Sequence, residues 1–469
     1  MSSRHLLLIS VGPVQDFIAS ARKLRDLWFG SYMLSELSKA VARHLHGQGV
    51  SLIFPSVGEG ETGLLEQDSD LCVVNKILAA VPAGTSPQEL ITGAKEAIRE
   101  QIRHYAENAL GQARKVGIRI NAEHFHQQVE DLGEFYAAWV PLGDDYADAR
   151  RRVETLMAGR KALRDFSAPS WDGSGRRKSS LDGARESVIA EKHSEKMGLL
   201  KRGERLDTMG VIKRCYPLNR KQTPHFDNLS DVAVVPYLSC IRSNDAAVEA
   251  LNELQHALRG SRFEKSGTAR RHSSLPLNVY SDALFLEPKE CRGYLGPGDV
   301  EDVVKCLQRL RKQVGGPDAY AAILVGDGDH MGTTIDEIIT ENGHRLFGKY
   351  LSQFASQVGE LIESKGGSLI YSGGDDVMAY LPLHTLLECV QAVRSCFAES
   401  MDKALEAIGV APTNLPTFSA GVAIVHHTAP LGDALAIARS AERMAKSEGG
   451  RNALAIIQNK RGGAPRSIY

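Results

Sequence analysis

The chain has 469 residues, 43% of them hydrophobic and 24% charged, which is the balance of a globular protein with enough apolar content for large cores. At about 100 to 200 residues per domain, two to four domains are expected. The formal net charge of −1 excludes a globally basic or acidic protein, so any contact with RNA or DNA must use a local patch.

The seven cysteines are scattered and include no Cys-x-x-Cys pair. This spacing argues against a disulfide framework and a structural zinc site, and it is typical of reduced thiols in a cytoplasmic protein. The apolar run over residues 5–11 is too short for a membrane span or a signal segment, so no membrane contact is expected. We interpret it as a buried strand.

The chain opens with a predicted strand, helix and strand, over 5–11, 14–45 and 51–54. Apolar spacing then predicts mostly helical structure over 89–115 and 124–164.

Two polar, basic stretches follow, at 171–180 and 259–274. The first contains too few branched aliphatic residues to bury much surface, so it indicates a solvated loop, with a basic tip for a polyanion as the alternative. We place the main domain boundary near residue 295, within a Pro/Gly-rich segment.

The last third has an alternating pattern of short apolar runs and amphipathic segments. It predicts strands over 321–325, 368–372, 377–381, 417–426 and 453–457, and helices over 347–362, 386–408 and 431–447. The order βαββαβ with an αβ extension is the ferredoxin-like plan.

Carboxylates are predicted to converge at one edge of this sheet. In a right-handed βαβ unit the first and second strands run parallel, with the third strand between them here, so their carboxyl ends share an edge. The first strand ends at Asp327, and the second ends at the turn formed by Gly373, Gly374, Asp375 and Asp376. Three carboxylates this close repel one another unless a cation such as Mg²⁺ or Mn²⁺ lies among them. Two-metal attack of a ribose hydroxyl on a nucleoside triphosphate is the chemistry implied.

Triphosphate contacts are predicted beside the acids. The backbone amides of Asp329, His330, Met331 and Gly332 could turn towards the phosphates, and Lys446 near a helix end could add a positive charge.

The same residues have plainer interpretations when taken one at a time. A Gly-Gly-Asp-Asp segment is a good hairpin turn, and a lone Lys446 is a solvent-facing helix residue. The pairs His124/His126 and His426/His427 have no obvious acidic or cysteine partner, so metal binding there is disfavoured. Walker A, serine-hydrolase and zinc-protease motifs are missing.

The chain resembles the large subunit of type III CRISPR effector complexes, the Cmr-type (III-B) palm-domain polymerase/cyclase family, across nearly its whole length. The last segments also resemble diguanylate cyclases of the GGDEF class. The resemblance rests on residues 5–18, 25–31, 53–55, 160–166, 203–206, 211–214, 327–332, 373–376, 419–427 and 450–455.

The resemblance implies an α+β protein with two ferredoxin-like, palm or GGDEF-like domains and a helical middle region. The domains expected are a first, non-catalytic palm over 1–130, with parts of 220–290 left open, a largely helical region with a flexible basic loop over 131–295, and a catalytic palm over 296–469. The resemblance also implies that metal ions are held by Asp327, Asp375, Asp376 and the Gly328 carbonyl. The 329–332 turn, Gly373, Gly374 and Lys446 contact the nucleotide, and Ser372 is a further candidate for a base contact.

The implied activity is synthesis of cyclic oligoadenylate from ATP when a Cmr-type complex, with its other subunits and guide RNA, engages target RNA in the cytoplasm. A catalytically silent scaffold that binds RNA and a stand-alone cyclic oligonucleotide synthase are the alternatives.

Three departures from the family pattern bear on function. An HD nuclease domain is not expected, because the palm-like segment starts at residue 5 and no His-Asp pair occurs. Zinc is not expected either, because the cysteine positions of some relatives hold Ser179, Asp182, Asp207 and Gly210. The resemblance leaves no expected counterpart of the family's C-terminal helical domain within this sequence, which implies either a truncated chain or different assembly contacts.

Overall fold

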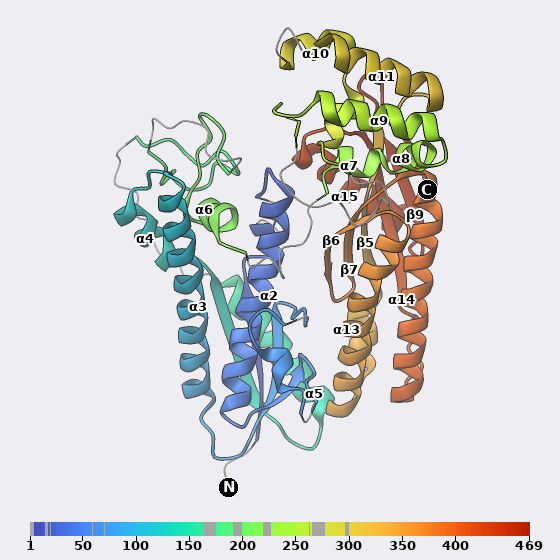
Figure 1. The fold of residues 1–469 in the computed structure, drawn as a ribbon. Coiled ribbons are helices and arrows are strands. Elements are labelled where there is room, and N and C mark those ends of the chain that lie inside the picture. The colour runs from blue at the N-terminus through green and yellow to red at the C-terminus, as the bar shows by residue number, and fades with distance from the viewer. Residues whose placement is uncertain are drawn as a thin grey trace.

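The computed structural model describes residues 4–14, 17–18, 20–58, 60–69, 71–163, 175–190, 199–218, 227–261, 263–264, 277–295 and 300–469. Two elongated lobes lie side by side, with a group of helices above the second (Figure 1). Of the two predicted basic stretches, residues 171–174, 262 and 265–274 lie outside the described residues.

The first lobe is built on a four-stranded sheet in the order β2-β3-β1-β4. Every neighbouring pair in this sheet is antiparallel. Its elements are β1 (His5–Gly12), α2 (Leu24–Gly47), β2 (Ser51–Phe54), η1 (Thr62–Leu65), β3 (Lys76–Val81), α3 (Pro87–Lys115), α4 (Ala122–Glu130), β4 (Glu134–Pro141) and α5 (Tyr146–Ala162).

Strand β4 corrects the sequence prediction, which made residues 124–164 mostly helical. Its residues pair with β1 along the whole of that strand, from His5↔Pro141 to Gly12↔Glu134. The expected boundary at residue 130 therefore falls before a strand of the first sheet.

The second lobe is built on a six-stranded sheet in the order β10-β9-β8-β5-β7-β6. As expected, β7 lies between β5 and β6 and is antiparallel to both, so β5 and β6 point the same way. Its elements are β5 (Tyr320–Asp329), α12 (Met331–Glu337), α13 (Glu341–Ser364), β6 (Ser368–Gly373), β7 (Asp376–Leu381), η3 (Leu383–Thr385), α14 (Leu386–Ile408), β8 (Thr417–His426), α15 (Leu431–Ser447), β9 (Leu454–Gln458) and β10 (Arg466–Ile468).

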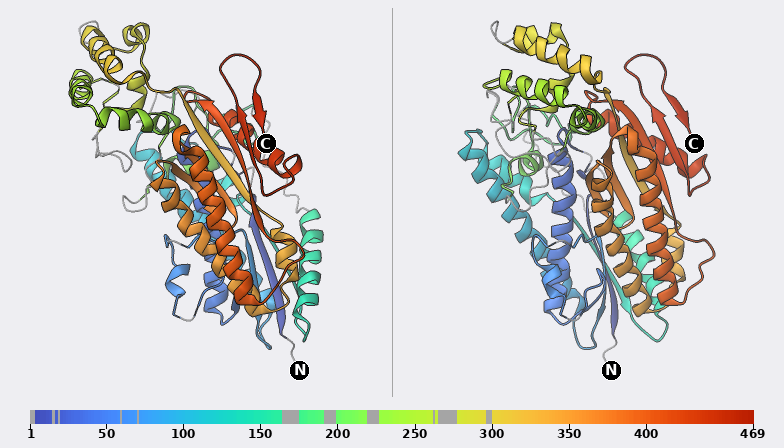
Figure 2. Two further views of the ribbon diagram at one scale, coloured as in Figure 1. Left: turned by 90° about the vertical axis from the view of Figure 1, so that its right-hand side faces the viewer. Right: turned by 45° about the vertical axis from the view of Figure 1, so that its right-hand side comes forward.

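Both faces of the second sheet are covered. Helices α13 and α14 lie side by side on one face (Figure 2), where Phe354 and Phe397 are fully buried. On the opposite face, α15 packs with Ala434 and Ala438, which are also fully buried. Burial of this apolar surface is the main stabilising contribution to the lobe.

The two sheets share one topology. The series β1-α2-β2-β3-α3-β4 and β5-α13-β6-β7-α14-β8 each place the third strand between the first two and the fourth strand beside the first. This is the ferredoxin-like arrangement, so the predicted α+β class with two such domains is confirmed.

The remaining helices divide between the lobes and a separate cluster. They are α6 (Thr208–Cys215), α7 (Leu229–Ala233), α8 (Val235–Arg242), α9 (Asp245–Ala257), η2 (Ser281–Phe285), α10 (Pro288–Tyr294) and α11 (Val300–Val314). Helix α6 packs on α2 and α3, and α7 packs on β5 and β7. Helix α11, which the sequence analysis assigned to the last domain, packs instead on α9 and α10.

Direct contacts join the lobes. The Arg345 guanidinium on α13 donates to the Leu52 carbonyl of β2 at 2.9 Å, and Arg150 on α5 pairs with Asp336 at 2.8 Å. The rings of Phe54 and His344 meet edge to face, with centroids 6.1 Å apart. Helix α13 therefore packs against the first lobe as well as its own sheet.

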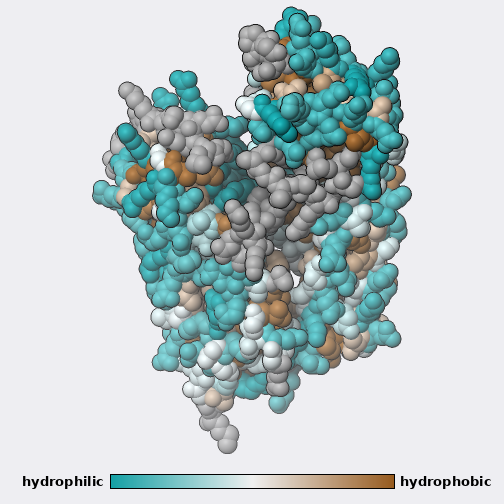
Figure 3. Space-filling view, viewed as in Figure 1, coloured by the Kyte–Doolittle hydropathy of each residue, from teal (hydrophilic) through white to brown (hydrophobic). Residues whose placement is uncertain are grey.

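The outer surface in the view of Figure 3 is mostly hydrophilic, and it is hollowed between the top of the first lobe and the helices above the second. Among the described residues, no helix combines the length and apolarity needed to cross a bilayer.

Candidate active site

The strand register brings the predicted acids to one edge of the second sheet. Gly326 pairs with Val377, and Gly373 pairs with Asp376, so Asp327 lies beside the end of the hairpin. The Asp327 carboxylate is within hydrogen-bonding reach of both Asp375 and Asp376. The three carboxylates thus converge.

Glycines make this close approach possible. Gly374 has a φ of 68°, as the first central residue of a type II′ hairpin requires, and Asp375 follows it. At Gly328 a Cβ would lie 2.9 Å from an Asp375 carboxylate oxygen, so only glycine lets the β5 backbone pass so near. At Gly373 a Cβ would lie 2.5 Å from the Tyr371 hydroxyl.

The surroundings of the acidic cluster disfavour the ionised form of its carboxylates. Burial, followed by the neighbouring Asp327 charge, raises the pKa of Asp375 to about 7. The same causes raise the pKa of Asp376, although this residue keeps access to solvent. Carboxylates arranged in this way favour an added cation.

Lys446 supplies a cation in this structure. Its ammonium pairs with Asp327 and, at 2.9 Å, with Glu442 on the same helix. Burial lowers its pKa, but the Asp327 and Glu442 carboxylates outweigh that effect and raise it. Lys446 therefore lies at the acidic edge, and here it contacts carboxylates.

The Asp329 carboxylate is held by hydrogen bonds within the fold. Its buried side chain accepts hydrogen bonds from the Thr417 hydroxyl at 2.9 Å, the Ser419 hydroxyl at 2.7 Å and the Asn452 backbone N–H at 3.0 Å. These bonds join the end of β5 to β8 and to the loop before β9. The carboxylate is thus held on the β8 side of β5.

The predicted phosphate-binding turn begins a short helix. His330 has a φ of 62° and caps α12, whose first residues are Met331 and Gly332. A Cβ at Gly332 would meet nothing within 4 Å, so the backbone there is open to a ligand. Backbone N–H groups at a helix start have no partner within the helix.

On β6, adjacent residues face opposite ways. The Ser372 hydroxyl donates to the Ala355 carbonyl of α13 at 3.1 Å, which ties it to the helix. Tyr371, which sequence reasoning missed, points to the acids: burial and then the charges of Asp376, Cys72, Asp375 and Asp327 raise its pKa. The period-two alternation of a strand could have indicated it, two residues before Gly373.

Whether the acids suit a metal depends on their chemistry and their arrangement. Carboxylate and carbonyl oxygens are the ligands that Mg²⁺ and Mn²⁺ prefer, and Asp327, Gly328, Asp375 and Asp376 offer only these. As the side chains stand, with Lys446 against Asp327, the described residues contain no group of three or more His, Cys, Asp or Glu placed to hold an ion. The chemistry of these donors fits such an ion, and their side chains would have to rearrange to hold one.

The other predicted positions have local roles. His124 contacts Gln128, and His427 stacks on Phe285 with centroids 3.9 Å apart. At the positions where the family resemblance had suggested a zinc site in other members, the Ser179 hydroxyl and the Gly210 backbone N–H both donate to Asp207, at 3.4 Å and 2.9 Å.

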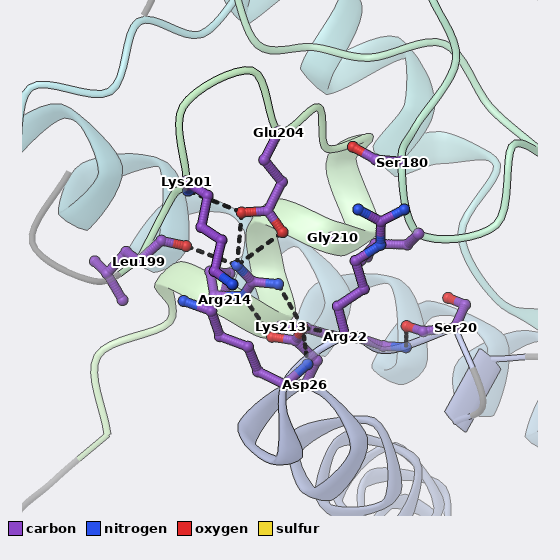
Figure 4. A network of polar contacts seen from close by, with 12 residues as sticks. Ser20, Arg22, Asp26, Ser180, Leu199, Lys201, Glu204, Gly210, Lys213 and Arg214 are labelled. Atoms are coloured by element: carbon purple, nitrogen blue, oxygen red, sulfur yellow. Dashed lines mark hydrogen bonds and ion pairs between the residues drawn. The ribbon is translucent and has the colours of Figure 1, made fainter. Parts of the chain in front are cut away.

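The first lobe has a buried charge network at the matching sheet edge. Arg214 donates to Asp26 at 2.6 Å and pairs with Glu204 at 3.2 Å (Figure 4). Beside it, Lys213 donates to the backbone carbonyls of Phe17 and Ser20. Its pKa is lowered to about 8 by burial. The network ties α6 to α2 and to the chain after β1.

Comparison with known proteins agrees with this pair of lobes. Residues 320–455 match the family described as Cas10/Cmr2, second palm domain, and residues 6–107 match CRISPR-associated protein Cmr2, N-terminal. The CRISPR system Cmr subunit Cmr2 of Pyrococcus furiosus is 26% identical, over 98% of this chain and 62% of the relative. The chain thus spans less than two thirds of that relative.

Two solved structures share the fold. A type III-B Cmr-beta complex in the apo state contains a chain that matches with a TM-score of 0.68 at 13% identity, covering 99% of this chain and 70% of that one. The Cmr-beta complex bound to cognate target RNA gives a TM-score of 0.65 at 14% identity, covering 100% and 71%. Through matches in both of its lobes, the chain therefore belongs to the Cas10/Cmr2 family.

Proposed function

We propose that this chain is the catalytic large subunit of an RNA-guided Cmr-type complex, and that it makes cyclic oligoadenylate from ATP when the complex engages target RNA. The observation that carries the proposal is the edge of the second palm, where Asp327, Asp375 and Asp376 converge and burial raises the pKa of Asp375 to about 7. A metal cation bound at such a site would relieve the repulsion among the carboxylates and attract the phosphates of a nucleotide.

In this proposal Asp327, Asp375, Asp376 and the Gly328 carbonyl hold Mg²⁺ or Mn²⁺. The ions supply charge stabilisation at the α-phosphate and activation of the attacking hydroxyl. Lys446, released from Asp327, pairs with the triphosphate.

The backbone N–H groups from Asp329 to Gly332 donate to phosphate oxygens, and the open backbone at Gly332 leaves room for them. The Tyr371 side chain lies beside Gly373 of the hairpin turn. Gly373 and Gly374 keep the turn clear of side chains. The hydrogen bond from Ser372 to Ala355 holds β6 against α13, so a contact from Ser372 to a base would require that bond to break.

The proposed partners follow from the relatives. A Cmr-beta complex has been solved with cognate target RNA, and its matching chain has this fold. We therefore extend to this chain the other Cmr subunits, guide RNA and target RNA as partners, and the cytoplasm as its place of action. Zinc has no part in the proposed chemistry.

The test is incubation of the purified chain with Mg²⁺ and either ATP or GTP, alone and within its guide-RNA complex with target RNA, with products identified by mass spectrometry. We expect cyclic oligoadenylate from ATP only when target RNA is present. The variant Asp375→Asn with Asp376→Asn should lose at least about a hundredfold in rate, the scale of removing groups that stabilise transition-state charge.

The matched control is Glu301→Gln with Asp302→Asn, which removes two exposed acids from α11 and should leave the rate unchanged. Circular dichroism and complex assembly must be preserved in both variants. No product under any condition would indicate the RNA-binding scaffold instead. Product from the isolated chain without RNA would indicate a stand-alone synthase.

A further inference from the structure

A pocket in the first lobe is lined by charged residues of one sign. It has a volume of about 460 Å³ and lies where α4 and α6 begin. Among the lining residues that the structure describes, four are arginines and none is acidic. Because the whole chain balances 56 basic against 57 acidic residues, this concentration is local. The arginines are Arg119, Arg176, Arg177 and Arg205.

The backbone around this arginine pocket is already held in place. The carbonyl of Arg119 accepts from the Ala190 N–H at 3.0 Å, that of Arg177 from the Ser187 N–H at 2.9 Å, and that of Arg205 from the Ser180 N–H at 2.8 Å. Three separate chain segments are thereby fixed around one space. A ligand that binds there would not have to order the backbone first.

Three of the guanidinium groups are available. Arg119 and Arg177 are exposed, and Arg205 is half-buried. Within the part of the chain that the structure describes, none of these three side chains makes an ion pair or a hydrogen bond. The contrast is Arg214, which is buried against Asp26 and Glu204.

The ligand that this arrangement suits is a phosphate ester. Arginine presents a planar fork of N–H donors that matches phosphate oxygens, and a concave site lined by one sign of charge concentrates the opposite ion. The lining also includes neutral residues such as Ile120, Asn121 and Val188, so the pocket has room and surface for more than a phosphate. A concave site receives a flexible strand more readily than a rigid duplex.

We propose that the arginine pocket binds the phosphate backbone of single-stranded RNA. This inference rests on the proposed function, which supplies RNA as a partner, and it assigns one contact to the first lobe, away from the catalytic edge. Arginine contacts to phosphate hold a strand without reading its sequence.

The test uses the full chain and a fluorescein-labelled oligouridylate, with binding followed by fluorescence anisotropy over a series of KCl concentrations. The variant Arg119→Ala, Arg177→Ala, Arg205→Ala should bind at least about tenfold more weakly. The slope of log affinity against log salt should fall by about 2, since each phosphate contact on a single strand contributes about 0.7.

The matched control is Arg151→Ala, Arg152→Ala, Arg466→Ala, which removes the same charge from exposed positions elsewhere. It should change affinity and slope much less. Equal losses in the two triple variants would overturn the proposal, because they would show a response to net charge alone.

A second arm separates RNA from free nucleotide. Binding of ATP and inorganic phosphate is measured on the same variants. Loss of ATP binding with unchanged RNA affinity in the pocket variant would overturn the proposal in favour of a nucleotide site. The variant Asp375→Asn, Asp376→Asn should keep its RNA affinity, so a failure of the catalytic proposal remains distinguishable from a failure of this one.

Discussion

Lys446 of α15 forms an ion pair with Asp327 at the end of β5, although the two residues lie 119 positions apart in the chain. Glu442, one helical turn before Lys446, holds the same ammonium at 2.9 Å. The acidic edge therefore contains a cation of the protein itself. A metal ion would have to displace the Lys446 ammonium from Asp327, whereas a triphosphate would have to recruit it.

Replacing Lys446 by methionine should have opposite effects on two ligands. Mg²⁺ alone should bind more tightly, because a competing cation is gone. ATP should bind about tenfold more weakly, because one charge-assisted contact is lost. Isothermal titration measures both, and Lys446→Arg, which keeps the charge, is the control. Weaker Mg²⁺ binding in the methionine variant would contradict a competing role for Lys446.

Removing the Asp329 side chain should lower the stability of the second lobe, because its main role is to hold the end of β5 and not to bind the nucleotide. In Asp329→Ala the donors from Thr417, Ser419 and Asn452 lose their shared acceptor, which should cost about 3 kcal/mol of unfolding free energy. Urea unfolding measures the loss, with the exposed Asp402→Ala as control. Unchanged stability with lost ATP binding would show that Asp329 is a ligand-binding residue.

Acid should weaken the contact between the lobes through His344. Burial lowers the pKa of this histidine from 6.5 to about 4, and its Nε2 donates to the Ile335 carbonyl at 2.9 Å. Between those values the unfolded chain binds more protons, so the free energy of unfolding rises with pH through this window and is lost as pH falls.

The change attributable to His344 should be roughly 2 kcal/mol. The measurement is urea unfolding at about pH 7 and about pH 4.5, and His344→Gln should flatten the difference. Because His427 is buried with a pKa lowered to about 4 as well, some pH dependence should survive in that variant. An unaltered pH dependence in His344→Gln would rule out this residue as a source.

Adding a methyl group at Gly421 should displace the helix that carries Lys446. A Cβ there would lie 2.0 Å from the backbone nitrogen of Glu442, a contact that requires α15 to move away from β8. Gly421→Ala should therefore destabilise the second lobe by more than about 2 kcal/mol and reduce nucleotidyl transfer. Gly432→Ala is the matched control, since a Cβ there meets nothing within 4 Å, and it should fold and react normally.

The second palm was predictable because each of its elements is locally self-consistent. The helix over 386–408 and the strand over 417–426 have the bounds that apolar periodicity indicated, and the glycine-rich turn marked the hairpin between β6 and β7. Convergence of Asp327 with the turn followed from topology alone.

Elements that depend on distant partners were less predictable. The apolar residues of β4 lie between two helices, and only pairing with β1, more than a hundred residues earlier, makes that segment a strand. The role of Asp329 depends on its register opposite Thr417. Tyr371 and the Lys446–Asp327 pair likewise require the folded arrangement, because a spacing pattern does not say which charged groups meet.

The two lobes share a topology but differ in the connection that follows their second strand. In the second palm a two-residue turn joins β6 to β7, whereas in the first palm residues 55–75 join β2 to β3. The end of that longer connection reaches across, and a Cβ at Gly374 would lie 3.3 Å from the Val74 side chain. The connection between β2 and β3 of the first lobe thus lies against the hairpin turn of the second lobe. Substitutions in residues 71–74 should consequently change how the second palm works without altering any of its residues.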